Sequence, residues 1–146
     1  MHDLPDTPFR QMLRGAIPPP PVAVLLGQTI QRVDVAAGEL EADFDALPSF
    51  ANPAGKVQGG MLAAMLDALT AGLVDATLSI GEGVTTLNLN VSYLSPADVG
   101  AIHGVAKLNR RGRAISNVSA QLTQGGKVVA TASAVCMVLN TDRGRQ

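Results

Sequence analysis

The chain has 146 residues, a length that a single folded domain accounts for, and 47% of them are hydrophobic. Eleven Lys and Arg against twelve Asp and Glu leave a net charge of −1, and there are only three Phe, one Tyr and no Trp. Both features argue against a nucleic-acid partner. Charged residues are 16% of the chain, against about 25% in an average domain, so polar surface is scarce and we expect a homo-oligomer.

The single cysteine and two histidines exclude a disulfide framework and a multi-cysteine zinc site, and we expect no bound metal. The N-terminus lacks the basic-then-apolar order of a secretion signal. The longest apolar run, 61–74, is shorter than the ~20 residues of a membrane-spanning helix and contains Asp67. We therefore expect a cytoplasmic protein with no membrane partner.

Three segments are expected along the chain. Residues 1–21 predict a short helix around 7–14 and a proline-rich lead-in, because Pro18–Pro21 lack N–H donors and hold the chain extended. Residues 22–140 are expected to form the domain, and 141–146 a C-terminal tail.

The domain begins with two extended segments within 28–44, joined by a hairpin near Gly38. Residues 47–57 are punctuated by Pro and Gly and predict a loop. A long helix is predicted over 61–78. Its face around Asp67 carries small residues and its opposite face large ones, and since nearly every side is apolar we expect it to be buried on nearly every side.

Four strands are predicted after this helix, over 84–94, 101–109, 113–123 and 127–139, with tight turns between the last three. In the first of them Leu87, Leu89 and Val91 alternate with polar residues, as in a sheet with unlike faces. Consecutive strands joined by tight turns indicate an antiparallel sheet. The expected fold class is α+β, with one antiparallel sheet wrapped around a long central helix.

Asp67 stands in the middle of an apolar helix with no cation three or four residues away. Burying a lone carboxylate is costly unless it finds partners or changes its pKa. Two interpretations stay open: a position at the solvent edge of the helix, or a base or nucleophile kept in a dry cleft. Asp75 is also unpaired, but it lies nearer the helix end, and we expect it to be solvated.

The helix starts at Gln58-Gly59-Gly60, where glycines leave backbone N–H groups unobstructed at the positive end of the helix dipole. Such groups can hold an anion or a polarised carbonyl oxygen, although a flexible helix entry gives the same pattern. Gly59 and Asp67 are eight residues apart, roughly 12 Å along a helix. One carbonyl cannot reach both in one chain, so joint action needs two subunits.

The charges are unevenly distributed. Residues 1–100 have eleven acidic and four basic side chains, and 101–146 have seven basic and one acidic. Four of the cations surround one predicted turn: Lys107, Arg110, Arg111 and Arg113. An arginine-rich turn can bind phosphates, and a solvated turn is the alternative.

The segment NPAGKVQGG (52–60), then Asp67, then NVSYLSP (90–96) resembles the hotdog-fold acyl-CoA thioesterases of the phenylacetic-acid-degradation and 4-hydroxybenzoyl-CoA thioesterase type, over about 21–139. The resemblance implies that Asp67 is the catalytic carboxylate, as general base or nucleophile.

Further roles follow from the same resemblance. The Gly59 N–H would polarise a thioester carbonyl from the partner subunit, and Asn52 would orient the water or the thioester. A strand hydroxyl would assist, with Thr86 the best match and Thr85 next. Gln58 stands where the family usually has histidine, and its amide cannot carry a proton away near neutral pH.

The expected function is hydrolysis of an acyl-CoA or aroyl-CoA by a homodimer or homotetramer, with coenzyme A as part of the substrate and no further cofactor. The acyl group is expected between subunits near Met61, Ala64 and Leu66, and the coenzyme A phosphates at the Lys107–Arg113 turn. A non-catalytic acyl-CoA binder, which Gln58 favours, stays open as the main alternative. A hotdog-type hydratase and a structural subunit rank lower.

Overall fold

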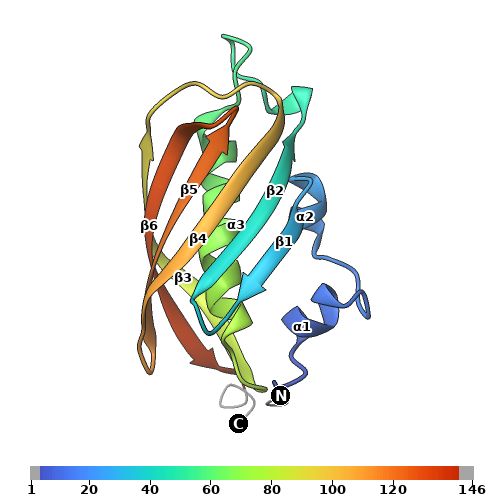
Figure 1. The fold of residues 1–146 in the computed structure, drawn as a ribbon, viewed down its shortest axis with the longest axis vertical. Helices are drawn as coiled ribbons and strands as arrows, with labels where there is room; N and C mark the ends of the chain where they lie inside the picture. The colour runs from blue at the N-terminus through green and yellow to red at the C-terminus, as the bar shows by residue number, and fades with distance from the viewer. Residues whose placement is uncertain (1–3, 142–146) are drawn as a thin grey trace.

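A computed structural model describes residues 4–141, so residues 1–3 of the predicted lead-in and 142–146 of the predicted tail lie outside the described residues. The elements in chain order are α1 (Pro8–Leu13), α2 (Pro21–Leu25), β1 (Thr29–Asp34), β2 (Glu39–Ala46), the 3-10 turn η1 (Pro48–Phe50), α3 (Gly59–Ala76), β3 (Glu82–Tyr93), β4 (Gly100–Arg111), β5 (Ile115–Gln124) and β6 (Lys127–Asn140). The predicted α+β architecture is confirmed: six antiparallel strands in the order β1-β2-β4-β5-β6-β3 wrap around α3 (Figure 1).

The N-terminal arm contains one helix more than its sequence pattern indicates. Thr7 caps α1 by accepting a hydrogen bond from the N–H of Arg10, as the predicted short helix requires. α1 ends at Leu13, with Arg14 as its C-cap and Gly15 at a positive φ, before the proline run is reached, and the last proline of that run, Pro21, starts α2. A proline at the first helical position loses no hydrogen bond, because that N–H has no partner inside the helix.

The large face of α3 packs into the concave side of the sheet, where Leu62, Met65, Leu69 and Leu73 are at most 3% exposed. By length and composition α3 is also apolar enough to cross a membrane, but in this structure it is the core helix. The prediction that α3 is buried on nearly every side is wrong for the single chain. On its small-residue face Thr70 and Val74 are fully buried, but Ala64, Asp67 and Ala71 are only half-buried.

Close contact between α3 and the sheet depends on Gly104 of β4. A Cβ atom at this position would lie 2.5 Å from Cδ1 of Leu69, which is fully buried. Gly72 on α3 differs, because a Cβ there would meet only Leu40, at an ordinary 3.7 Å.

These two glycines give opposite predictions for substitution by alanine. Gly104→Ala should lower the free energy of unfolding by about 1–3 kcal/mol, because the fully buried side chain of Leu69 would have to shift. Gly72→Ala should raise it by about 0.5–1 kcal/mol, because glycine inside a helix costs backbone entropy. Urea titration of both variants measures the two free energies of unfolding. A Gly104→Ala protein as stable as the wild type would contradict the close packing of Leu69 against Gly104.

Candidate active site

Asp67 projects from the half-buried face of α3 toward β3, where the hydroxyl of Thr86 donates a hydrogen bond of 2.8 Å to its Oδ1. The other carboxylate oxygen, Oδ2, has no hydrogen-bond partner among residues 4–141. Asp67 is therefore fixed in orientation through one oxygen, while the second oxygen is available to a ligand or a water molecule.

Thr86 reaches Asp67 because β3 contains a β-bulge. The register with β6 pairs Thr86 with Cys136 and Asn88 with Val135, so Leu87 is an extra residue with no partner. Its side chain is 54% exposed. Bulges change the direction in which neighbouring side chains point, and this one turns Thr86 to the inner face of the sheet. Of the two threonines considered from the sequence, Thr86 is the one that contacts Asp67.

The thiol of Cys136 lies beside this pair and is fully buried. Burial raises the pKa of the thiol, the neighbouring hydroxyl of Thr86 opposes this effect, and the negative charge of Asp67 raises the pKa further. Cys136 therefore stays protonated and neutral near pH 7 and supplies an apolar floor under Thr86.

The first turn of α3 presents unpaired backbone donors. Gln58 is the N-cap residue, but its exposed side chain makes no capping hydrogen bond. The N–H groups of Gly59 and Gly60 have no partner in the described part of the chain. They lie at the positive end of the helix dipole, so this helix start can polarise a carbonyl oxygen.

Tyr93, at the far end of β3, lies directly on this helix start. Its hydroxyl donates a hydrogen bond of 2.8 Å to the carbonyl oxygen of Gly59. A Cβ atom on Gly59 would lie 3.2 Å from Cζ of the Tyr93 ring, so a larger residue than glycine would press against the ring. In the sequence Tyr93 was only part of the family pattern, and nothing in its spacing indicates this contact.

Asn52 organises the loop that leads into α3. Its Oδ1 accepts hydrogen bonds from the N–H groups of Ala54 and Lys56, at 3.0 and 3.1 Å. Its own N–H donates to the carbonyl of Lys56. Asn52 therefore shapes the approach to Gln58, and no hydrogen bond joins it to Asp67 within the described chain.

The predicted phosphate-binding residues fall into two groups. The guanidinium of Arg111 donates to the hydroxyl of Thr77, just past the end of α3, and Lys107 lies 4.0 Å from Glu39. Arg110 and Arg113 are exposed, without ion-pair partners among the described residues. Only these last two are free cations at the β4–β5 turn.

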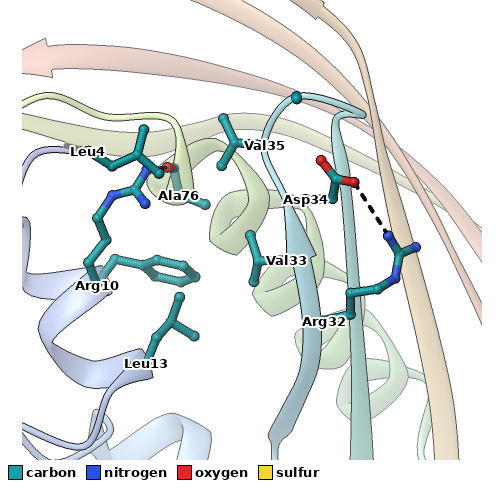
Figure 2. Close-up of a pocket in the computed structure, with 10 residues that line it drawn as sticks. Leu4, Arg10, Leu13, Arg32, Val33, Asp34, Val35 and Ala76 are labelled. Carbon is teal, nitrogen blue, oxygen red and sulfur yellow. Dashed lines mark hydrogen bonds and ion pairs between the residues drawn. The ribbon is translucent and has the colours of Figure 1, made fainter. Parts of the chain in front are cut away.

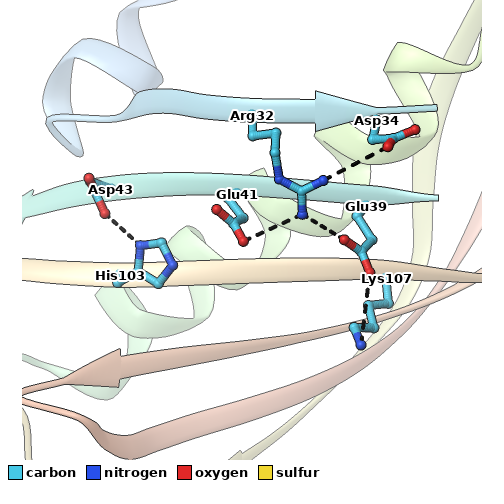
Figure 3. A network of polar contacts seen from close by, with 7 residues as sticks. All are labelled: Arg32, Asp34, Glu39, Glu41, Asp43, His103 and Lys107. Carbon is cyan, nitrogen blue, oxygen red and sulfur yellow. Dashed lines mark hydrogen bonds and ion pairs between the residues drawn. The ribbon is translucent and has the colours of Figure 1, made fainter. Parts of the chain in front are cut away.

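Lys107 belongs to a polar network on the outer face of the sheet (Figure 3). There Arg32 contacts Glu39 and Glu41, and the ring of His103 lies 2.7 Å from Asp43. His103 is half-buried and its contact is with Asp43 of β2, on the outer face of the sheet.

The residues proposed to line an acyl pocket also separate. Met61 and Ala64 are half-buried on the accessible face of α3. Leu66 is 0% exposed in the core, so the expectation that it lines a gap between subunits is wrong for this structure.

Within residues 4–141, four cavities are lined by residues of the N-terminal arm, and two of them also border α3. The larger, of about 560 Å³, is lined by Phe9, Arg10 and Leu13 of α1 and by the end of β1 (Figure 2). There Arg10 donates to the carbonyl of Ala76, at the opposite end of α3 from Gly59. This cavity is therefore remote from the start of α3.

The smaller cavity, of about 150 Å³, is lined by Asp75 together with Phe9, Met12 and Gly72. Asp75 is half-buried there, and the expectation that it is solvated is wrong, because α1 and α2 cover this part of α3. Burial raises the pKa of Asp75 above its ordinary value of 3.8.

The arrangement of one antiparallel sheet around one long helix, with a carboxylate on that helix, defines a hotdog-fold protein of the thioesterase type. A family model described as "Acyl-CoA thioesterase N-terminal domain" matches residues 47–137. The chain belongs to the hotdog-fold acyl-CoA thioesterase family, as its resemblance predicted.

Two solved structures illustrate the similarity. A phenylacetic acid degradation-related protein from Ralstonia eutropha JMP134 is 56% identical, over 88% of this chain and 98% of that chain, with a TM-score of 0.87. A thioesterase from Haemophilus influenzae shares the fold at 21% identity, over 85% and 86% of the two chains, with a TM-score of 0.77. No curated protein matches the chain.

The raised pKa of Asp75 predicts a pH-dependent stability difference. A carboxyl whose pKa is higher in the folded state makes the protein lose stability as the pH rises through that value. Asp75→Asn removes this loss. The variant should therefore match the wild type below pH 3.8 and be more stable at pH 7.

Urea unfolding at several pH values measures this difference. Asp45→Asn, at an exposed carboxylate, is the matched control and should show a smaller change. Equal stability of Asp75→Asn and wild type at pH 7 would mean that Asp75 is well solvated after all.

Proposed function

We propose that this protein hydrolyses an acyl-CoA or aroyl-CoA to the free acid and coenzyme A, with Asp67 as the catalytic carboxylate. The observation that carries the proposal is the pairing of Asp67 with Thr86, which leaves Oδ2 of Asp67 unbonded on an accessible helix face. The family membership supplies the substrate class, a thioester of coenzyme A.

The chemistry requires a hydrogen-bond donor for the thioester carbonyl oxygen and a base for the attacking water. The unpaired N–H of Gly59 stabilises negative charge that develops on the thioester oxygen. Asp67 takes a proton from water as the water oxygen attacks the carbonyl carbon. The C–S bond then breaks, and the leaving thiolate of coenzyme A takes up a proton.

Direct attack by Asp67 on the carbonyl carbon is the other route: it breaks the C–S bond, releases the coenzyme A thiolate and forms an anhydride, which water then opens at the aspartyl carbon. A single turnover in H₂¹⁸O separates the two routes, because only the covalent route places the label in Asp67.

The geometry supports a two-subunit site. Gly59 and Asp67 are separated by roughly 12 Å along α3, so one thioester meets them only from different copies of the chain. Two surfaces are suited to association: the half-buried small-residue face of α3, and β3, an edge strand without a fully buried residue. A homodimer, or a tetramer built from two dimers, would complete the site, and we expect it in the cytoplasm.

Gln58 has an orienting role in this proposal. Its exposed amide adjoins the Gly59 N–H and can hold the thioester by hydrogen bonds, but it cannot accept a proton near neutral pH. The same feature favours the second candidate function, a protein that binds acyl-CoA without hydrolysing it. Asn52 acts earlier, by shaping the loop before Gln58.

The acyl group is expected against Met61 and Ala64 on the accessible face of α3. For the coenzyme A phosphates, Arg110 and Arg113 are better placed than Lys107 and Arg111, because the last two already have partners.

The proposed role of Asp67 predicts the following variants. Asp67→Asn should lower kcat by about 10²–10⁴-fold, the contribution typical of a general base. Thr86→Val should lower kcat by about 10–100-fold, because a hydrogen bond to a charged group is worth about 1.5–3 kcal/mol. Thr85→Val is the control and should retain near-normal turnover, since neighbouring strand residues face opposite sides of the sheet and the hydrogen bond to Asp67 comes from Thr86.

Release of thiol from aromatic, short-chain and long-chain acyl-CoAs gives these rates. Full turnover by Asp67→Asn would refute the mechanism. Tight binding of acyl-CoA by the wild type without thiol release would identify the non-catalytic binder.

Phosphate binding predicts a change in KM. Replacing both Arg110 and Arg113 by alanine should raise KM for acyl-CoA about fivefold at low salt, since exposed ion pairs contribute up to about 1 kcal/mol each. The effect should shrink at high salt because salt screens exposed charges. Lys127→Ala, an exposed cation at the β5–β6 turn, should leave KM unchanged, and an equal effect there would point to general charge attraction.

A further inference from the structure

The two unpaired amides at the start of α3 are connected through the carbonyl of Gly59. A planar peptide unit contains the carbonyl of one residue and the N–H of the next. The Gly59 carbonyl and the Gly60 N–H therefore move as one rigid unit. The Gly59 N–H belongs to the preceding unit, and the two units meet at the α-carbon of Gly59.

Tyr93 contacts both of these units. Its hydroxyl donates to the Gly59 carbonyl at 2.8 Å, and its ring covers the α-carbon, since an added Cβ would lie 3.2 Å from Cζ and 3.3 Å from Oη. A hydrogen bond to the carbonyl end of a peptide unit polarises the N–H at its other end. Tyr93 can thus orient both amides and strengthen the Gly60 N–H as a donor.

Burial in the core does not explain this contact. The side chain of Tyr93 is 53% exposed, and the hydrogen bond itself is at the surface. A surface hydrogen bond contributes little to folding. Around Gly60 the structure is open, because a Cβ there would have no neighbour within 4 Å. A ligand oxygen therefore has space to approach these amides.

We propose that Tyr93 is a positioning residue, which holds the N–H groups of Gly59 and Gly60 as two convergent donors for the substrate carbonyl. The inference rests on the proposed function and adds two elements to it: Gly60 as a second donor, and Tyr93 as the residue that fixes the pair.

The test uses Tyr93→Phe, which keeps the ring and removes the hydroxyl. The kcat for thiol release should fall about tenfold with KM changed less than twofold, because misplaced donors weaken the transition state more than the ground state. Leu94→Ala is the matched control, because Leu94 is the next side chain along and is 59% exposed. It should leave both constants unchanged.

A second measurement needs no turnover. The probe is a ketone analogue of the acyl-CoA, with the sulfur replaced by CH₂ and the carbonyl labelled with ¹³C. Bound to the wild type, its infrared carbonyl stretch should lie at lower frequency than in buffer, and Tyr93→Phe should lose part of that shift while Leu94→Ala keeps it.

Thermal unfolding tests the contact itself. Gly59→Ala should lower Tm when Tyr93 is present and should not do so in a Tyr93→Ala background, where the methyl group has space. Additive effects of the two substitutions would overturn the contact.

The outcomes separate this inference from the proposed function. A wild type that shifts the carbonyl stretch but releases no thiol refutes hydrolysis and leaves the Tyr93 inference standing. Wild-type kcat and carbonyl stretch in Tyr93→Phe overturn the inference, whether or not the protein hydrolyses acyl-CoA. A wild type that does not shift the stretch overturns it as well.

Discussion

The hydrogen bond between Thr86 and Asp67 is the interaction on which the candidate site depends. It ties a carboxylate in the middle of the core helix to the edge strand of the sheet, at 2.8 Å. A carboxylate on a packed apolar helix needs a donor to offset its lost hydration, and Thr86 supplies it through one oxygen. The other oxygen keeps its capacity for chemistry. The same contact that makes Asp67 tolerable in the fold therefore also sets its orientation.

Much of the fold and part of the site could be predicted from the sequence. The ends of the central helix and of the last four strands were placed within two residues, because each boundary carries glycine, proline or a change of period. The spacing from Gly59 to Asp67 was also predictable, since a helix fixes the distance between any two of its residues. Such features depend on local geometry, which the order of residues specifies directly.

Other features depend on contacts that local patterns do not specify. If β3 alternated regularly, Thr86 and Leu89 would point to opposite faces of the sheet. Only the register with β6 shows that Leu87 is an extra residue, which brings the two to the same face. The burial of Asp75 depends on α1 and α2 folding over α3, and α2 begins in a proline run that predicts extended chain. The contact of Tyr93 with Gly59 joins residues 34 positions apart. In each case a distant segment decides the environment.

The bulge at Leu87 has a consequence for the length of β3. Thr86 and Tyr93 are seven residues apart, an odd number, so in a regular strand their side chains would point to opposite faces. With one residue bulged out, Thr86 pairs with Cys136 and Tyr93 with Ala130, two inward positions of β6. One strand thus supports both functional groups that this chain contributes, the carboxylate and the amide donors. Its parity is part of the active-site design: at this seven-residue spacing, a β3 strand without the bulge would turn either Thr86 or Tyr93 to the outer face and lose one of the two contacts.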